Sequence, residues 1–126
     1  MAVIKSFRDL IVYKKAFELT YRIYEITKSF PKDEQYSLTD QIRRSSRSIC
    51  ANLAEAWGRK IYPKAFLNKL SDALAEEMET EFWLDLCVRY RYIDDTTYNT
   101  LIDEYGEISK MLTSMMNNPE RFYRER

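Results

Sequence analysis

The chain has 126 residues, of which 45% are hydrophobic and 32% are charged, and its 20 Lys and Arg side chains balance 20 Asp and Glu side chains. This length and composition predict a single globular domain over residues 1–126 and exclude a disordered chain. The sequence has no histidine, which excludes His-activated nucleophiles and imidazole zinc ligands. It has only 2 glycines and no Gly-rich phosphate loop. We therefore expect no enzyme activity, cofactor or metal site.

The first predicted helix covers residues 9–28, with Asp9 as its N-cap. Apolar residues repeat along it at steps of three and four, which places them on one face. A second set, mostly aromatic, lines a neighbouring face: Leu10, Tyr13, Phe17, Tyr21 and Tyr24. Together they form more apolar surface than one packing seam needs. The second set is either part of a broad core face with tyrosine hydroxyls in water, or a surface that meets another copy of the protein.

The second predicted helix covers residues 37–58 and has three faces. Pro31 ends the first helix, and the short connection predicts an antiparallel return. The packing seam consists of larger apolar residues: Leu38, Ile42, Ile49, Leu53 and Trp57. A polar stripe runs beside it: Gln41, Arg44, Ser48, Asn52, Glu55 and Arg59. Arg43 and Arg47 are predicted to point away from both stripes and to form a basic outer face.

The third predicted helix covers residues 63–90, and Pro63 suits its first turn. The apolar spacing places Glu77 in the packing seam, where a carboxylate is costly unless it is paired. We therefore expect Glu77 or Glu76 to meet the second helix near Arg44 and Asn52, so that alanine substitutions of Glu77 and Arg44 have coupled effects on stability. This predicted structural polar edge comprises Arg44, Asn52, Glu55, Glu76 and Glu77.

The fourth predicted helix covers residues 95–117 and is capped by Asp94 or Asp95. Its seam is an unbroken repeat at steps of three and four: Tyr98, Leu101, Tyr105, Ile108, Leu112 and Met115. Pro119 follows its end, and the charged tail over residues 120–126 is predicted to be mobile. Four amphipathic helices with short links predict an all-α protein, an antiparallel up-down-up-down four-helix bundle.

Charge is distributed unevenly along the chain. Residues 1–60 contain twelve Lys and Arg against seven Asp and Glu, whereas residues 61–126 contain eight against thirteen. Either the basic and acidic helices pack against each other, or the basic half presents a patch to RNA or another acidic partner.

No apolar run is long enough to span a membrane and no leader-like segment opens the chain, so we expect no membrane partner and a cytoplasmic location. Cys50 and Cys87 are expected to be buried thiols.

The second helix also contains a recognisable motif. The motif consists of Gln41-Ile42-Arg43-Arg44, Ser48-Ile49, Asn52-Leu53-Ala54-Glu55 and Arg59. It resembles the signature of the bacterial four-helix-bundle proteins encoded in intervening sequences of 23S ribosomal RNA genes. Further segments are similar to that pattern: Phe7-Arg8-Asp9-Leu10, Phe30-Pro31-Lys32, Glu79-Thr80 and Trp83-Leu84. Ala56 departs from the pattern where the family usually has glycine, and Cys50 where it often has proline.

The resemblance implies a bundle that assembles as a ring, a homopentamer. It also implies kinship with the accessory variability proteins of diversity-generating retroelements, which assist a reverse transcriptase and bind nucleic acid. The intervening-sequence proteins have no settled biochemical activity, so the resemblance implies an assembly and not a mechanism.

These observations lead to three functional hypotheses. The first is a noncatalytic oligomeric scaffold that binds RNA or a ribonucleoprotein through Arg43, Arg47, Arg59, Lys60 and Lys64, which otherwise form an ordinary solvated basic face. The second is a protein–protein interaction module that has a polypeptide partner, binds no nucleic acid and uses the aromatic first helix and the acidic second half. The third is a carboxylate-based enzyme or metal binder that uses Glu76, Glu77, Glu79 and Glu81.

Overall fold

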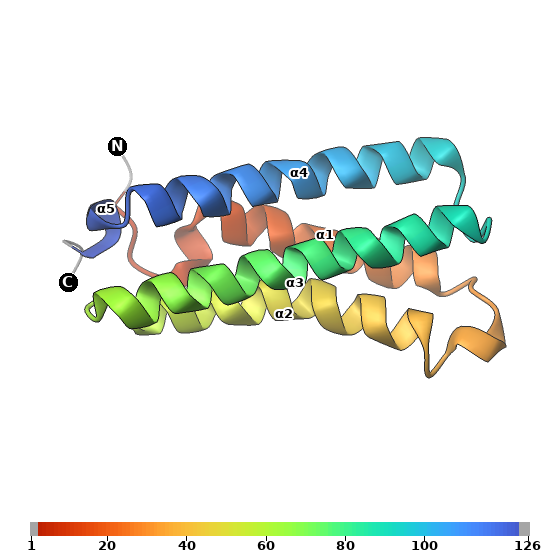
Figure 1. Cartoon of the computed structure of the whole chain (residues 1–126), viewed down its shortest axis with the longest axis horizontal. Helices are drawn as coiled ribbons and strands as arrows, with labels where there is room; N and C mark the ends of the chain where they lie inside the picture. Colours follow the sequence, from red (N-terminus) through yellow and green to blue (C-terminus); the bar gives the residue numbers. More distant parts are fainter. Residues whose placement is uncertain (1–2, 124–126) are drawn as a thin grey trace.

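The protein is a bundle of four long helices (Figure 1). A computed structural model describes residues 3–123. The long helices are α1 (Ile11–Thr27), α2 (Leu38–Gly58), α3 (Pro63–Arg89) and α4 (Asp95–Asn117). Three short helices accompany them: η1 (Phe7–Asp9), η2 (Lys32–Glu34) and α5 (Glu120–Tyr123). Successive long helices run in opposite directions, and the predicted all-α four-helix bundle is confirmed.

The helix ends follow from capping residues, with two differences from the prediction. Asp94 caps α4, since its Oδ1 accepts a hydrogen bond from the Thr97 backbone N–H at 2.7 Å. Asp9 does not cap α1: its Oδ2 accepts from the Ser6 N–H at 3.2 Å in the capping box of η1, and α1 starts after the extended Leu10. Residues 120–123 of the tail, predicted to be mobile, form α5, and residues 124–126 lie outside the described residues.

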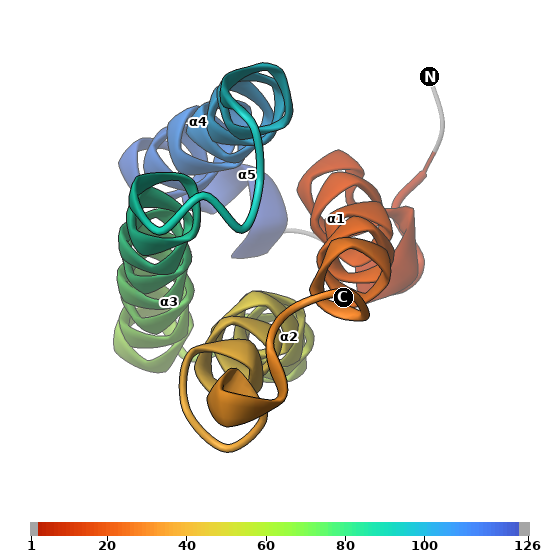
Figure 2. The same ribbon diagram turned by 90° about the vertical axis from the view of Figure 1, so that its right-hand side faces the viewer.

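Each long helix occupies one corner of the bundle and packs against two neighbours (Figure 2). The α2–α3 pair packs most extensively, since small buried residues such as Ser45, Ala56 and Ala73 let the two backbones approach. The α1–α4 pair packs least. Within residues 3–123, no helix combines the length and apolar character that crossing a membrane requires.

The core is apolar along most of its length but contains a polar layer near the middle. Ile23, Ile42, Leu70 and Ile108 are fully buried, one from each helix. The polar layer lies among them and includes Ser45 and Ser46 of α2, Glu77 and Thr80 of α3, and Tyr105 of α4. The hydroxyl oxygens of Thr80 and Ser45 are 2.8 Å apart and hydrogen-bonded. By contrast, neither carboxylate oxygen of Glu77 has a hydrogen-bond partner among the described residues. The phenol oxygen of Tyr105 has none among them either.

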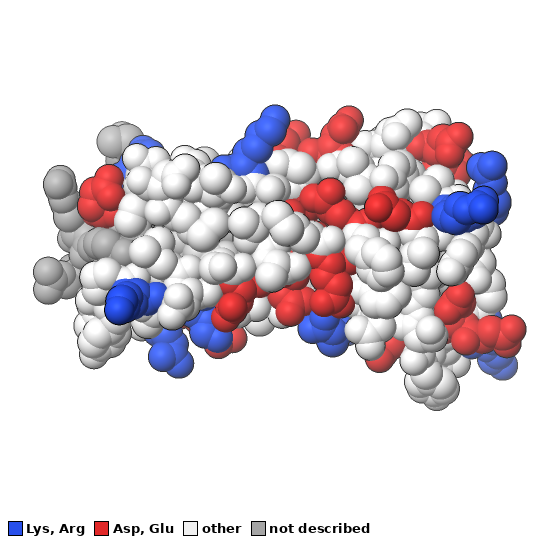
Figure 3. Space-filling view, viewed as in Figure 1, with Lys and Arg blue, Asp and Glu red and all other residues white. Residues whose placement is uncertain are grey.

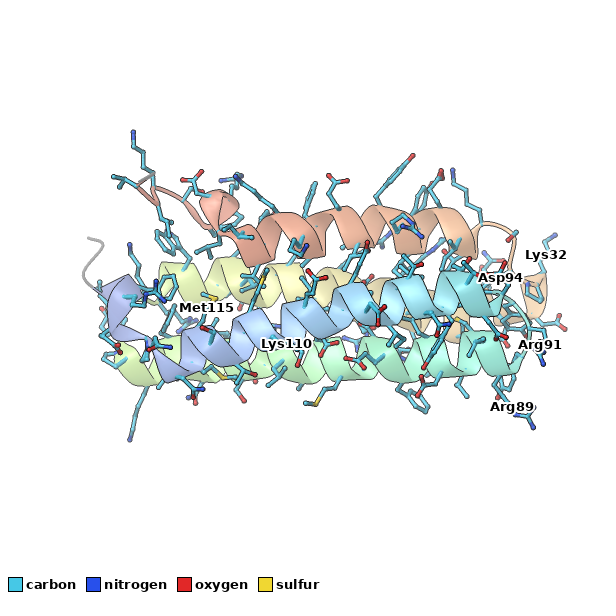
Figure 4. The ribbon with its side chains drawn as sticks, turned by 90° about the horizontal axis from the view of Figure 1, so that it is seen from above. Lys32, Arg89, Arg91, Asp94, Lys110 and Met115 are labelled. Atoms are coloured by element: carbon cyan, nitrogen blue, oxygen red, sulfur yellow. The ribbon has the colours of Figure 1, made fainter. Side chains whose placement is uncertain are left out.

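The turn that follows α3 contains a strained backbone position. Arg91 has φ of 65°, in the left-handed region, at the end of the bundle where Lys32 also lies (Figure 4). The Tyr92 N–H donates to the Cys87 carbonyl at 2.9 Å and the Arg91 N–H donates to the Val88 carbonyl at 3.1 Å, the pattern of a Schellman motif. This conformation favours glycine, because a Cβ atom in the left-handed region lowers the stability by about 1 kcal/mol.

We predict that Arg91→Gly raises the free energy of unfolding by about 1 kcal/mol, measured by urea denaturation. Arg91→Ala is the matched control, because it removes the same charge and keeps the Cβ atom. An equal gain in both variants would show that the arginine side chain, and not its backbone conformation, sets the cost.

Candidate nucleic-acid interface

Arg43 is not on the outer face of α2, and this part of the sequence prediction is wrong. Its Nε donates a hydrogen bond to the Thr27 hydroxyl at 2.8 Å, and its guanidinium carbon lies 5.0 Å from the centre of the Tyr24 ring. The side chain is half-buried because α1 covers this side of α2. Arg43 is therefore held in place by α1, and part of its charge faces an aromatic ring.

Arg47 lies one turn further along α2 and is exposed. It borders a shallow hollow of about 400 Å³ between α2 and α1. The rest of the hollow is lined by residues of α1: Phe17, Glu18, Thr20, Tyr21 and Tyr24. Among residues 3–123, no hydrogen bond or ion pair neutralises the Arg47 guanidinium. We call this side of the bundle, where Arg43 and Arg47 adjoin Phe17, Tyr21 and Tyr24, the α1–α2 face.

The aromatic residues of the α1–α2 face are exposed and do not form a core face. Phe17 is 54% exposed, Tyr21 is 60% exposed and Tyr24 is 39% exposed. Figure 4 shows a row of α1 side chains that project away from the other helices. From the same predicted set, Leu10 is buried and Tyr13 is half-buried. Of the two alternatives for this set, the broad core face therefore holds near the start of α1 and does not hold along the rest of it.

The other three candidate cations form a separate cluster. Arg59 caps the C-terminus of α2, and Lys64 is exposed in the first turn of α3. The Lys60 ammonium lies 3.7 Å from the centre of the Trp57 ring. Sixteen residues of helix separate Arg43 from Arg59, which corresponds to about 24 Å. The structure therefore does not bring the five predicted cations into one patch.

The predicted polar edge lies along the α2–α3 seam, with a different set of acidic partners. Arg44 Nη2 donates to Glu76 Oε1 at 3.1 Å and to Glu79 Oε2 at 2.7 Å. Burial alone would raise the pKa of Glu79, but hydrogen bonds from Trp83 and Arg44 lower it overall. The expected contact of Arg44 is therefore present for Glu76 and absent for Glu77. Glu79, which the sequence prediction left out of the edge, is the second partner.

The remaining members of the edge make local contacts. The Asn52 amide donates to the Ser48 carbonyl of its own helix at 2.9 Å. Glu55 lies 3.0 Å from Lys69 Nζ across the α2–α3 seam. This edge consists of neutralised charges and satisfied amides, so we interpret it as structural.

Glu77 is next to Glu76 in sequence but faces the core, because adjacent helix positions differ by about 100°. Its side chain is 0% exposed. Burial, together with the neighbouring Glu81 carboxyl, raises the pKa of Glu77 from its ordinary 4.5 to about 9. Within residues 3–123, no group of three or more His, Cys, Asp or Glu side chains could hold a metal ion. Glu77 is a neutral acid enclosed by the bundle at pH 7.

Both cysteines are buried free thiols, as predicted. Burial raises the pKa of the Cys50 and Cys87 thiols to about 12. Because the thiolate is the reactive form, both are poor nucleophiles near neutral pH.

Ion pairs join the basic and acidic halves of the chain but leave the α1–α2 face charged. Lys15 of α1 lies 3.1 Å from Glu107 of α4, and Arg44 of α2 pairs with α3. Figure 3 shows the side formed by α3 and α4, where acidic side chains gather along the middle. The packing of basic against acidic helices is thus real, but it does not include Arg47.

Comparison with known proteins identifies the family. The model of the 23S rRNA-intervening sequence protein family matches residues 8–114. A crystal structure of a protein with unknown function from the S23 ribosomal protein family of Bacteroides thetaiotaomicron is 34% identical, with a TM-score of 0.77; the match covers 85% of this chain and 96% of that chain. No curated protein matches the chain. The chain therefore belongs to the 23S rRNA-intervening sequence protein family.

Proposed function

We propose that the protein is a noncatalytic scaffold that assembles into a ring of identical chains and binds RNA, alone or within a ribonucleoprotein, through the α1–α2 face. The observation that supports this most strongly is Arg47, an exposed and unneutralised cation beside exposed aromatic rings. Phosphate contacts from Arg and aromatic contacts to bases are the usual components of RNA binding. The family name also links these proteins to ribosomal RNA genes.

The chemistry of the side chains supports a noncatalytic role. The sequence has no histidine to act as a general base. Its thiols are buried with a raised pKa, and Glu77 is enclosed by the bundle. Glu76 and Glu79 were also candidates for catalysis from the sequence, but both carboxylates pair with Arg44.

Two apolar surfaces support assembly with further copies of the chain. The first, which we call the α3 strip, consists of Met78 and Phe82, which are 58% and 50% exposed. The second, which we call the end groove, has a volume of about 600 Å³ between the start of α1 and the end of α4, and is lined largely by apolar residues that include Ile4, Ile11, Met111 and Phe122. Because the two surfaces differ, a contact between them is head-to-tail, and such a contact builds a ring when the rotation from one chain to the next closes. The family resemblance implies five chains.

A ring would present several copies of one weak basic face to the same RNA. Each copy contributes few cations, so a single chain would bind weakly. Linked copies raise the effective concentration and strengthen binding without new contacts. The proposed RNA binding therefore depends on the proposed assembly.

Charge reversal at Arg47 tests the RNA-binding part of the proposal. We expect Arg47→Glu to weaken binding of a fluorescein-labelled 20-nucleotide RNA at least tenfold in fluorescence anisotropy at 50 mM salt, because it replaces a phosphate contact by repulsion. Arg59→Glu, in the separate cluster, is the matched control and should change binding little. Circular dichroism verifies that both variants fold. Unchanged RNA affinity in Arg47→Glu would contradict the assignment, and a loss confined to Arg59→Glu would move the site to the other end of α2.

A further inference from the structure

The aromatic residues of the α1–α2 face are spaced regularly along α1. Phe17, Tyr21 and Tyr24 follow one another at four and three residues, so they lie on one side of the helix about 4.5 to 6 Å apart along its axis. All three line the hollow beside Arg47. Phe17 and Tyr21 are more than half exposed, although burial would stabilise such large rings. The Phe17 ring stacks on the Tyr13 ring, with centroids 5.6 Å apart, and cations lie against the Tyr24 ring. The three rings thus form a short ladder whose accessible surface is mostly that of Phe17 and Tyr21.

Cations lie beside this ladder from two helices. The Arg43 guanidinium carbon is 5.0 Å and the Lys28 ammonium is 4.8 Å from the centre of the Tyr24 ring. Hydrogen bonding to Thr27 fixes Arg43, whereas Arg47 has no partner among residues 3–123. Two acidic side chains are nearby: Glu18 lines the hollow, and Glu25 lies 2.8 Å from Lys28, which neutralises it. The cations therefore outnumber the acids around the rings.

We propose that this ladder makes the α1–α2 face selective for single-stranded RNA, an inference that rests on the RNA binding proposed above. Unpaired bases stack on Phe17 and Tyr21, while the backbone phosphates lie toward Arg47. Base–aromatic stacking needs a free base face, which a duplex does not offer at its side. Successive bases of an extended strand lie several ångströms apart, a spacing that one helical turn of α1 reproduces. Stacking tolerates any base, so the preference is for strandedness and not for sequence.

A second copy of the chain is the main competing occupant of this surface. The charges favour RNA, because the aromatic rings adjoin Arg43, Arg47 and Lys28 and not an apolar surround. The end groove, by contrast, is lined mainly by apolar residues, with one cation, Lys14, and one acid, Asp9, among them, and the α3 strip consists of two apolar side chains. Light scattering on a variant without these rings measures the mass of the assembly and so distinguishes the two occupants.

The test compares a labelled 12-nucleotide oligouridine with a 12-base-pair RNA duplex in fluorescence anisotropy. We expect the wild-type protein to bind the single strand at least tenfold more tightly than the duplex. The double variant Phe17→Leu/Tyr21→Leu keeps apolar side chains but removes the rings, and we expect it to bind the single strand at least tenfold more weakly with little change for the duplex. Tyr36→Leu, which removes an 86% exposed tyrosine outside the hollow, is the matched control and should bind as the wild type does.

Other outcomes would overturn either base stacking on these rings or the proposed RNA binding itself. Equal binding of single strand and duplex, or no effect of the double variant, would overturn stacking on these rings while the proposed RNA binding stands. If wild-type protein binds neither RNA, the proposed function itself fails. A fall in the mass of the assembly in light scattering for Phe17→Leu/Tyr21→Leu, with its RNA preference intact, would assign the ladder to contacts between copies and overturn this inference.

Discussion

Replacing Glu77 with methionine should raise the free energy of unfolding by about 3 kcal/mol at pH 8, one of the largest single-residue gains that we expect in this protein. Glu77 is 0% exposed, and neither carboxylate oxygen has a hydrogen-bond partner among the described residues. Methionine has a similar length, favours helices and needs no hydrogen bond. The substitution therefore removes the cost of burying an unpaired acid without leaving a large cavity.

The stability gained by Glu77→Met should depend on pH, and the raised pKa of Glu77 decides whether it grows or shrinks as the pH rises. The unfolded chain loses the proton near pH 4.5, whereas the folded protein keeps it up to about pH 9. Between these values the folded state binds more protons than the unfolded state, so the wild-type protein loses stability as the pH rises. We expect Glu77→Met to abolish this slope, and its gain over the wild type to be smallest near pH 4.5 and largest near pH 9.

Urea denaturation at several pH values measures both effects. Glu18→Met is the matched control, because Glu18 is exposed and the change should stay within about 0.5 kcal/mol at every pH. A loss of stability in Glu77→Met across the whole range would mean that the buried carboxyl contributes favourable interactions, and a pH slope unchanged by the substitution would mean that another group titrates.

Introducing two charges into the α3 strip should convert the proposed ring into single chains. Met78 and Phe82 are 58% and 50% exposed, and the proposed head-to-tail contact buries both against the end groove of the next chain. Unpaired carboxylates in such a contact cost several kcal/mol at every interface. We therefore expect Met78→Glu/Phe82→Glu to elute with the mass of one chain and with unchanged helix content.

Asn99→Glu is a suitable control for this variant, because Asn99 is exposed on α4 and outside both apolar surfaces. It should retain the mass of the wild-type assembly. If Met78→Glu/Phe82→Glu also retains that mass, the α3 strip is not the contact between copies.

The sequence predicted the helices well because their apolar residues repeat without interruption. The seam of α4 from Leu101 to Met115 is buried at every predicted position, and Asp94 caps this helix. The start of α1 was displaced because Ser6 and Asp9 together cap η1. The left-handed conformation of Arg91 gave no sequence signal, since glycine or asparagine is the usual residue there.

The site was harder to predict because a helical pattern gives angles around one axis and not the positions of neighbouring helices. Arg43 was predicted to face solvent, but α1 covers that side of α2 and Thr27 accepts its hydrogen bond. Glu77 was correctly placed in the seam, yet its partner was not, since Arg44 lies at the surface beside Glu76 and Glu79. The exposure of Phe17 and Tyr21 likewise depends on how α1 is rotated against the bundle.

Size-exclusion chromatography with light scattering tests the proposed RNA-binding ring most directly, if the 260/280 nm absorbance ratio is recorded on protein purified from cells at low salt. We predict a mass near five chains together with excess absorbance at 260 nm that high salt removes. A multimer without nucleic acid would instead favour a scaffold for polypeptide partners. A single chain free of nucleic acid would contradict both the assembly and the RNA binding proposed for this protein.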